Sequence, residues 1–259
     1  MFTINKRINP SQLGQPQDAE LQQSISRYGF TLAEVLITLG IVGIISAMTI
    51  PALINNYRAT KLRTQFNKNY SLIAQVFRRM EAEGVDTHPK DYKGDSFYKT
   101  FAKYLTNTTD CGGYSDGNSS NLERPGCYSY KLASKDKAGS YKSLIGNSHI
   151  GDGAFNNGQL LLPDGTLIFF DDSPDREGWV GTLIWVDING YNSPPNRLGY
   201  DFFVFEVVNG VLFPEGDINS TSPDKKDKYC AGKYGYGFSC TIRAAGNQNY
   251  FKEIVKTLK

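Results

Sequence analysis

The sequence predicts an α+β protein in which one long N-terminal helix packs on an antiparallel β-sheet head. Three observations predict this fold. Residues 35–54 contain no Asp, Glu, Lys or Arg, and an apolar stripe with helical spacing follows them. The rest of the chain alternates short apolar segments with Asp-Gly and Asn-Gly pairs, which is typical of antiparallel hairpins.

The uncharged segment, residues 35–54, is long enough to cross a membrane, because a helix of about 20 apolar residues spans a hydrocarbon core of about 30 Å. Glu34 lies directly before it, where a carboxylate in lipid costs roughly 2.5 to 3.5 kcal/mol and needs a partner. The only cation close to it is Arg27, on the far side of Gly29. Cleavage after Gly29 would place the new ammonium of Phe30 at the i, i+4 helical spacing from Glu34.

The residues at this junction resemble the processing signal of type IV prepilins and of the related pseudopilins of type II secretion. The matching features are a polar, net basic leader and the sequence Gly-Phe-Thr-Leu-Ala-Glu from Gly29 to Glu34. The resemblance implies cleavage between Gly29 and Phe30 by a prepilin peptidase, and N-methylation of Phe30. It also implies that Glu34 pairs with the N-terminus of a neighbouring subunit, and that Gly43 and Pro51 loosen the helix on assembly.

Taken with this resemblance, the sequence divides into four parts. Residues 1–29 form a leader peptide, residues 30–54 a transmembrane and filament-core helix, residues 55–83 its amphipathic continuation, and residues 84–259 a globular β-rich head. The implied fold is a pilin-like roll. The implied location is the inner membrane, as a single-pass protein with its head outside the cytoplasm, and then a cell-surface or periplasm-spanning filament. The implied partners are prepilin peptidase, other pilin subunits and inner-membrane lipid, and an ordinary signal anchor is the alternative.

The helix is expected to run from Phe30 to about Glu83, a length of about 80 Å at 1.5 Å per residue. Pro51 removes one i to i−4 hydrogen bond and is expected to bend it, and Gly84 is expected to end it. After Pro51 the apolar stripe recurs at spacings of three and four residues, at Leu62, Phe66, Tyr70, Ile73, Phe77 and Met80.

The head is predicted to begin with a short helix at residues 96–105, capped by Asp95, and a Gly-, Ser- and Asn-rich surface loop at residues 111–125. Two hairpins follow, one around Asp164-Gly165 and one around Asn209-Gly210. Residues 183–188 are expected to form a central strand between them. Residues 248–259 are expected to form a final helix.

All four cysteines lie beyond the membrane-spanning segment, at Cys111, Cys127, Cys230 and Cys240. An even number in two close pairs predicts disulfides in an oxidising compartment. Three connectivities can join four cysteines, and sequential pairing, which closes two short loops, is favoured. A zinc site is the competing interpretation, but no Cys-x-x-Cys spacing occurs and the histidines His88 and His149 are isolated.

The charge distribution bears on partners and topology. The leader carries one net positive charge of the +2 of the whole chain, so the mature protein is nearly neutral and nucleic-acid binding is not indicated. The positive-inside rule alone would place the head in the cytoplasm, because four cations closely follow the uncharged segment: Arg58, Lys61, Arg63 and Lys68. The cysteines and the prepilin signal indicate the opposite side, and cations on a continuing helix can face a filament or lipid phosphates.

One loop has the composition of a cation site. Asp187 and Asn189 place oxygen-bearing side chains at alternate positions before Gly190, as calcium loops do, and Asn196 and Asp201 follow closely. We therefore consider calcium bound by Asp187, Asn189, Asn196 and Asp201, which the resemblance supports because some major pseudopilins bind calcium in the head. A structural Asn-Gly turn that needs no metal is favoured over it. No other cofactor is expected.

The chain has no Gly-x-Ser-x-Gly, no His-Glu-x-x-His and no phosphate-binding glycine loop, so no catalytic residue and no enzyme activity are predicted. The leading hypothesis is a structural subunit of a type IV pilus. The alternatives are a pseudopilin of a type II secretion system and a membrane-anchored adhesin or sugar-binding protein. Residues 230–240 favour a pilin, because such a loop staples the edge of many pilin heads, while its aromatics Tyr234, Tyr236 and Phe238 could contact sugar.

Overall fold

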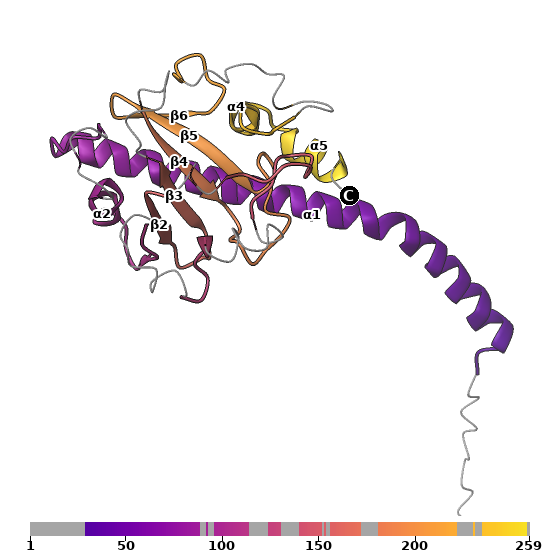
Figure 1. Cartoon of the computed structure of the whole chain (residues 1–259). Helices are drawn as coiled ribbons and strands as arrows, with labels where there is room; N and C mark the ends of the chain where they lie inside the picture. The colour runs from indigo at the N-terminus through magenta and orange to yellow at the C-terminus, as the bar shows by residue number, and fades with distance from the viewer. Residues whose placement is uncertain are drawn as a thin grey trace, which may run out of the picture. The chain divides into compact units, whose positions relative to one another are not determined.

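The computed structural model describes residues 29–88, 92, 96–113, 124–130, 140–151, 153, 156–171, 181–221, 230 and 235–257. The predicted leader, apart from Gly29, and most of the predicted loop at residues 111–125 lie outside them. The chain divides into two compact units, Met1–Met48 and Thr49–Lys259. The fold is α+β, with a long N-terminal helix and an antiparallel sheet on which its C-terminal half packs (Figure 1).

Helix α1, Leu32–Ala82, includes Pro51 without interruption. Gly84, which has a φ of 67°, terminates the helix just beyond Ala82, as the sequence predicted. The Val85 N–H donates to the Met80 carbonyl at 2.9 Å, and the Gly84 N–H donates to the Glu81 carbonyl at 3.0 Å. These are the two hydrogen bonds of a Schellman motif, which only a residue tolerant of left-handed backbone closes without strain. The bend expected at Pro51 stays a prediction.

The N-terminal half of α1 exposes its apolar side chains. None of residues 32–58 is buried, and the most exposed of the large apolar side chains are Leu32, Met48 and Leu53. Among the described residues, α1 is the one helix long and apolar enough to cross a membrane, and none of its most apolar stretch is buried. A core helix of a water-soluble protein would bury such a stretch, so this half of α1 needs an apolar environment from outside the chain.

The described strands form one antiparallel sheet in chain order, β1 to β6. Its strands are β1 (Thr109–Asp110), β2 (Gly158–Leu161), β3 (Leu167–Asp171), β4 (Thr182–Asp187), β5 (Phe202–Val208) and β6 (Val211–Pro214). The two predicted hairpins are β2–β3 and β5–β6, and the predicted central strand is β4. In the β5–β6 turn, Asn209 and Gly210 have φ values of 51° and 77°, the positive values that a type I′ turn requires.

One face of the sheet packs on the C-terminal half of α1, which crosses it in Figure 1. Phe66 of α1 lies at the centre of this core. Its ring centroid is 4.8 Å from that of Phe203 on β5 and 5.7 Å from that of Phe251 on helix α5, Tyr250–Thr257. Of the predicted stripe, Tyr70 is half-buried and the other five residues are buried: Leu62, Phe66, Ile73, Phe77 and Met80.

The other face of the sheet is covered by a second cluster, here called the aromatic layer, which has no counterpart in the sequence prediction. Tyr141 stacks on Phe202 with ring centroids 4.0 Å apart, and Phe238 contacts Trp185 edge-on at 5.4 Å. Every residue of β3 and β4 is buried as a result. The members of the aromatic layer that come from outside the strands are Tyr128, Tyr130, Tyr141, Ile150, Leu198 and Phe238.

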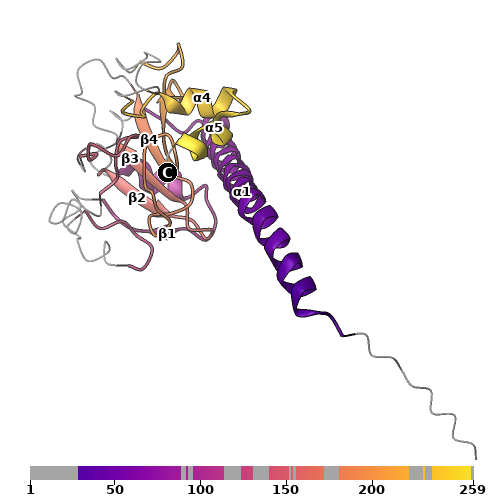
Figure 2. The ribbon, with the colours of Figure 1, turned by 90° about the vertical axis from the view of Figure 1, so that its right-hand side faces the viewer.

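The remaining helices partly match the prediction. Helix α2, Ser96–Ala102, ends earlier than the predicted 96–105, and its predicted cap Asp95 lies outside the described residues. Helix α5 is the predicted C-terminal helix. Helix α4, Cys240–Gly246, was not predicted, and Figure 2 shows it beside α5. Helix α4 has only seven residues, which is too short for apolar residues to repeat at helical spacing.

Candidate functional site

The predicted processing site lies at the start of α1. Gly29 and Phe30 precede the helix, and Phe30 is 88% exposed. Thr31 caps the helix, because its Oγ1 accepts a hydrogen bond from the Glu34 N–H at 3.2 Å. The Glu34 carboxylate in turn accepts hydrogen bonds from the Thr31 N–H and from the Thr31 hydroxyl, each at 2.8 Å. This reciprocal arrangement is a capping box, which satisfies free N–H groups at a helix start.

The capping box gives Glu34 hydrogen-bond partners before cleavage, in addition to the charged partner expected from the sequence. Thr31 supplies two hydrogen-bond donors although it carries no charge. The sequence signal was present, since Thr-x-x-Glu before an apolar segment is the pattern of a capping box. The ammonium of Phe30 would therefore add a charged partner to a carboxylate that is already hydrogen-bonded.

The two residues assigned to assembly within the apolar half, Gly43 and Pro51, are both exposed. A Cβ atom added at Gly43 would meet nothing within 4 Å, and the same holds for Gly40. A glycine in a helix interior destabilises the helix by about 0.5–1 kcal/mol relative to alanine. Because the space beside Gly43 is empty, packing within this chain does not explain why a glycine stands there. The role of Gly43 and Pro51 in assembly stays a prediction.

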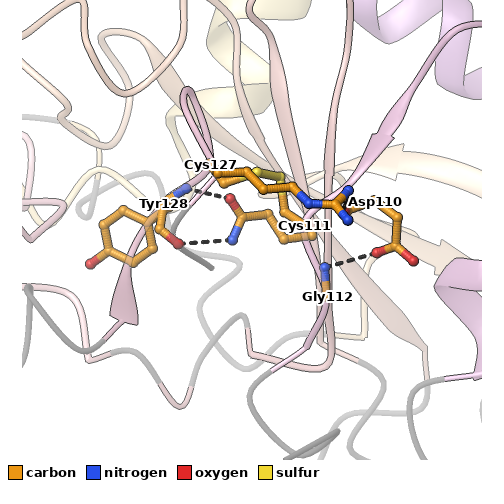
Figure 3. Close-up of a disulfide and its surroundings, with 7 residues drawn as sticks. Asp110, Cys111, Gly112, Cys127 and Tyr128 are labelled. Atoms are coloured by element: carbon orange, nitrogen blue, oxygen red, sulfur yellow. Dashed lines mark hydrogen bonds between the residues drawn. A yellow bond between two sulfur atoms is a disulfide. The ribbon is translucent and has the colours of Figure 1, made fainter. Parts of the chain in front are cut away.

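The first cysteine pair ties the start of the sheet to a neighbouring loop. Cys111 and Cys127 form a disulfide with a Cα–Cα distance of 5.8 Å (Figure 3). Next to it, the buried side chain of Gln159 on β2 binds the backbone of Tyr128 twice, accepting from its N–H at 2.5 Å and donating to its carbonyl at 3.1 Å. The disulfide and Gln159 together fix Tyr128 in the aromatic layer.

The second pair, Cys230 and Cys240, has a Cα–Cα distance of 4.7 Å. Both disulfides follow the sequential pairing that the sequence favoured, and no described cysteine is free. In the loop that the second pair closes, Phe238 is buried and Tyr236 is half-buried against the aromatic layer. Tyr234 lies outside the described residues. Phe238 therefore covers the sheet and does not present a ring to a sugar.

Loss of the disulfides should destabilise the head. The bonds link residues 16 and 10 positions apart, and closing loops of this size contributes about 3 kcal/mol each in the entropic model. We expect the double variant Cys230→Ser, Cys240→Ser to lose about 2–4 kcal/mol of unfolding free energy in urea titrations of the full-length protein in detergent. Alkylation of the unreduced wild type should modify no cysteine, and labelling of any thiol would contradict the pairing.

The four predicted metal ligands lie at the end of β4 and in the loop that leads to β5. Asp187 and Asp201 are fully buried. Asp187 accepts hydrogen bonds from the Tyr141 hydroxyl and the Gly190 N–H, both at 2.8 Å, and Asp201 accepts from the Asn196 N–H at 3.0 Å. Both carboxylates thus stabilise the backbone of their own loop, as the structural-turn alternative requires.

Two features of the loop also fit calcium. The Oδ1 atoms of Asn189 and Asn196 are buried and accept no hydrogen bond within the described residues. Carboxylate and amide oxygens are the ligands that calcium takes in proteins. The set contains only two carboxylates, because the described residues place no third His, Cys, Asp or Glu with them. Calcium at Asp187, Asn189, Asn196 and Asp201 therefore stays a prediction.

The two buried carboxyls favour their protonated forms. Burial raises the pKa of Asp187 to about 7, although hydrogen bonds from Tyr141, Asn189 and Gly190 act in the opposite direction. The pKa of Asp201 is raised well above its ordinary value, first by burial and then by the negative charge of Asp187. The head accordingly contains two neighbouring acids that resist ionisation together.

These pKa shifts predict a head that loses stability as the pH rises. Because the folded pKa of Asp187 lies above its unfolded value, the stabilisation is complete below about pH 4 and is lost as the pH approaches 7. In the presence of a chelator, we expect the unfolding free energy to fall by about 2–4 kcal/mol between pH 5 and pH 8. Asp187→Asn should reduce this slope, whatever its effect on stability at pH 5. If the unfolding free energy of the wild type did not change, or rose, between pH 5 and pH 8, the raised pKa of Asp187 would be contradicted.

Calcium binding would reverse this pH effect at neutral pH. Calcium needs ionised carboxylates, so saturating calcium should raise the melting temperature at pH 8 and have little effect at pH 5. Asp187→Ala should abolish the difference between calcium and chelator. Magnesium at the same concentration serves as the control, since its octahedral geometry suits such a loop poorly. An unchanged melting curve at pH 8 leaves the structural turn as the explanation of the loop.

Comparison with known proteins addresses the N-terminal part of the chain. The family model described as the prokaryotic N-terminal methylation motif matches residues 26–50. Neither the curated proteins nor the solved structures contain a match to the chain. The matched residues include Gly29, Phe30 and Glu34 and most of the uncharged segment. The chain therefore carries the prokaryotic N-terminal methylation motif, a prepilin signal of the type IV pilin-like kind.

Proposed function

We propose that this protein is a structural pilin-like subunit, cleaved by prepilin peptidase and assembled through its N-terminal helix into a type IV pilus filament. The observation that carries the proposal is the methylation motif at the start of an exposed apolar helix. The same helix, α1, continues into the core of a disulfide-bonded head. The subunit's role is structural and not enzymatic.

The apolar half of α1 serves two environments in this proposal. Before assembly it crosses the inner membrane with the head outside the cytoplasm, where disulfides form. In the filament the same side chains pack against neighbouring helices, so the apolar surface that lipid covered is buried by protein. The carboxylate of Glu34 then pairs with the ammonium of Phe30 on another subunit, which selects the register between helices.

The chemical state of the N-terminus tests this proposal. Mass spectrometry of the protein from its native host should find a mature chain that begins at N-methylated Phe30. The same species should be present in filaments sheared from the cell surface. Surface material that retains residues 1–29 would contradict the proposal.

A pseudopilin of a type II secretion system would carry the same motif and the same kind of helix. The two functions differ in where the filament ends and in what is lost without it. Deletion of the protein should remove surface filaments and leave protein secretion intact if it is a pilin. Loss of secretion without loss of surface filaments would assign it to the secretion machinery.

A further inference from the structure

A cationic pocket lies between α1 and the β4–β5 loop, within the unit Thr49–Lys259. Its volume is about 420 Å³. Helix α1 contributes Arg58, Lys61 and Gln65, and the loop contributes Ser193, Arg197 and Tyr200. None of the described residues that line this pocket is acidic. Its electrostatic character is set by three cations from two separate parts of the chain.

These cations are not neutralised within the described part of the chain, where Lys68 and Asp164 form the one ion pair. The Nε atom of Arg197 is buried and has no hydrogen-bond acceptor among the described residues. The Arg197 guanidinium lies over Gly146, where an added Cβ would be 2.9 Å from Nη2. The absence of a side chain at Gly146 thus leaves space for the Arg197 guanidinium, whose Nε keeps an unused donor among the described residues.

The acid behind the pocket does not compensate Arg197. The carboxylate of Asp201 accepts hydrogen bonds from the backbone N–H groups of Asn196 at 3.0 Å and Arg197 at 2.6 Å, and forms no ion pair with the Arg197 side chain. Arg58 and Arg197 both lie near the buried Tyr200. Burial and the charge of Asp201 raise the pKa of Tyr200, and the charges of the two arginines act in the opposite direction. Both arginines line the same pocket, and a pair of guanidinium groups binds a phosphate oxyanion well.

The position of the pocket along α1 indicates the source of that phosphate. Residues 35–54 are uncharged, and at 1.5 Å per residue Arg58 and Lys61 follow Ile54 by about 6 Å and 10 Å. The polar layer on each side of a bilayer is about 5–8 Å thick, so Arg58 lies at the depth of the lipid phosphates and Lys61 at the outer edge of that layer. Tyr57, which is 67% exposed, is an aromatic residue at the same interface, where tyrosine is enriched in membrane proteins.

We propose that this pocket binds the phosphate of an anionic phospholipid headgroup while the subunit resides in the membrane. The inference rests on the proposed function to the extent that residues 30–54 lie in a bilayer. It gives a role to the cations that follow the uncharged segment, which the positive-inside rule alone would place in the cytoplasm. Lipid bound by Arg58, Lys61 and Arg197 would hold the head against the membrane surface before assembly, and release of that lipid would accompany extraction into a filament.

Lipid titration of the full-length protein in mild detergent tests the proposal. Native mass spectrometry would count bound phosphatidylglycerol and phosphatidylcholine on the wild type. We expect the wild type to bind phosphatidylglycerol at least about fivefold more tightly than phosphatidylcholine. Arg58→Gln and Arg197→Gln should each weaken phosphatidylglycerol binding about fivefold, the effect of one cation near an anionic surface, and leave phosphatidylcholine unchanged. Arg58 is exposed, so its replacement should not disturb folding, which melting curves would check.

Arg63→Gln is the matched control, because Arg63 has the same charge on the same helix but does not line the pocket. Equal binding of both lipids by the wild type, or equal weakening by Arg63→Gln, would overturn the proposal. Displacement of phosphatidylglycerol by millimolar inorganic phosphate would assign the pocket to a free anion. Variants that bind lipid normally but form no filaments would assign it to a neighbouring subunit. Glu34→Val should keep the lipid preference, so this proposal and the assembly proposal can fail separately.

Discussion

Replacing Glu34 by valine should give a cleaved, membrane-embedded protein that is largely missing from sheared surface filaments. A lone carboxylate near the hydrocarbon is unfavourable for a monomer, so its loss should leave insertion intact or improved. In a filament the carboxylate would meet the ammonium of another subunit's Phe30 in a medium of low dielectric. Removal of one partner there leaves the other charge uncompensated, at a cost of about 3 to 5 kcal/mol.

Two further variants separate this pairing from the capping box at the start of α1. Glu34→Gln keeps a side chain that can complete the box but has no charge, so filaments should still be lost. Thr31→Val removes the hydroxyl and keeps the charge, so the helix start should weaken by about 1 kcal/mol while filaments persist. Quantitative immunoblots of sheared and membrane fractions measure both. Normal assembly of Glu34→Gln together with failure of Thr31→Val would show that Glu34 acts as a cap and not as an ion-pair partner.

Gly29→Val should block maturation. The peptidase must hold the backbone at the cleavage site extended and close to its own, and a β-branched side chain both restricts that backbone and adds bulk. Gly29 lies outside α1 and a Cβ there would meet nothing within 4 Å, so the substitution should not disturb the structure of the chain itself. The expected result is an uncleaved precursor in the membrane, seen as a larger band and as an unmodified leader by mass spectrometry.

Gly43→Ala provides the control for Gly29→Val, because it also adds a Cβ at an open glycine but lies fourteen positions further along the chain. We expect Gly43→Ala to be cleaved normally. Gly29→Ala should be intermediate, since alanine adds one methyl group without β-branching. Efficient cleavage of Gly29→Val would show that the peptidase does not require a bare backbone at this position.

Local signals predicted the elements whose structure they decide. The Asp164-Gly165 and Asn209-Gly210 pairs located both hairpins, because a tight turn depends on the residues within it. The apolar stripe of α1 identified its buried face because helical spacing repeats regardless of what packs on it. Gly84 ended the helix for an equally local reason, its tolerance of positive φ.

The aromatic layer could not be predicted in this way. Tyr141 meets Phe202 although the residues are 61 positions apart, and neither lies in a periodic segment that identifies the other. Tyr128 is held by a disulfide and by Gln159, which are contacts that only the folded chain creates. For the candidate sites, the motif at Gly29 and Glu34 was readable from sequence. The cationic pocket could not be predicted, because Arg197 comes close to Arg58 only when the β4–β5 loop folds against α1.

The ends of the sheet restrict how copies of this protein can join. Among the described residues, one edge is β1, only two residues long, and the other is β6, which closes on Pro214, a residue without an N–H to donate. Short edge strands and edge prolines prevent a sheet from recruiting a strand of another molecule. Copies of the protein therefore have little opportunity to stack into amyloid-like ribbons, even at the high local concentration that the proposed filament would create.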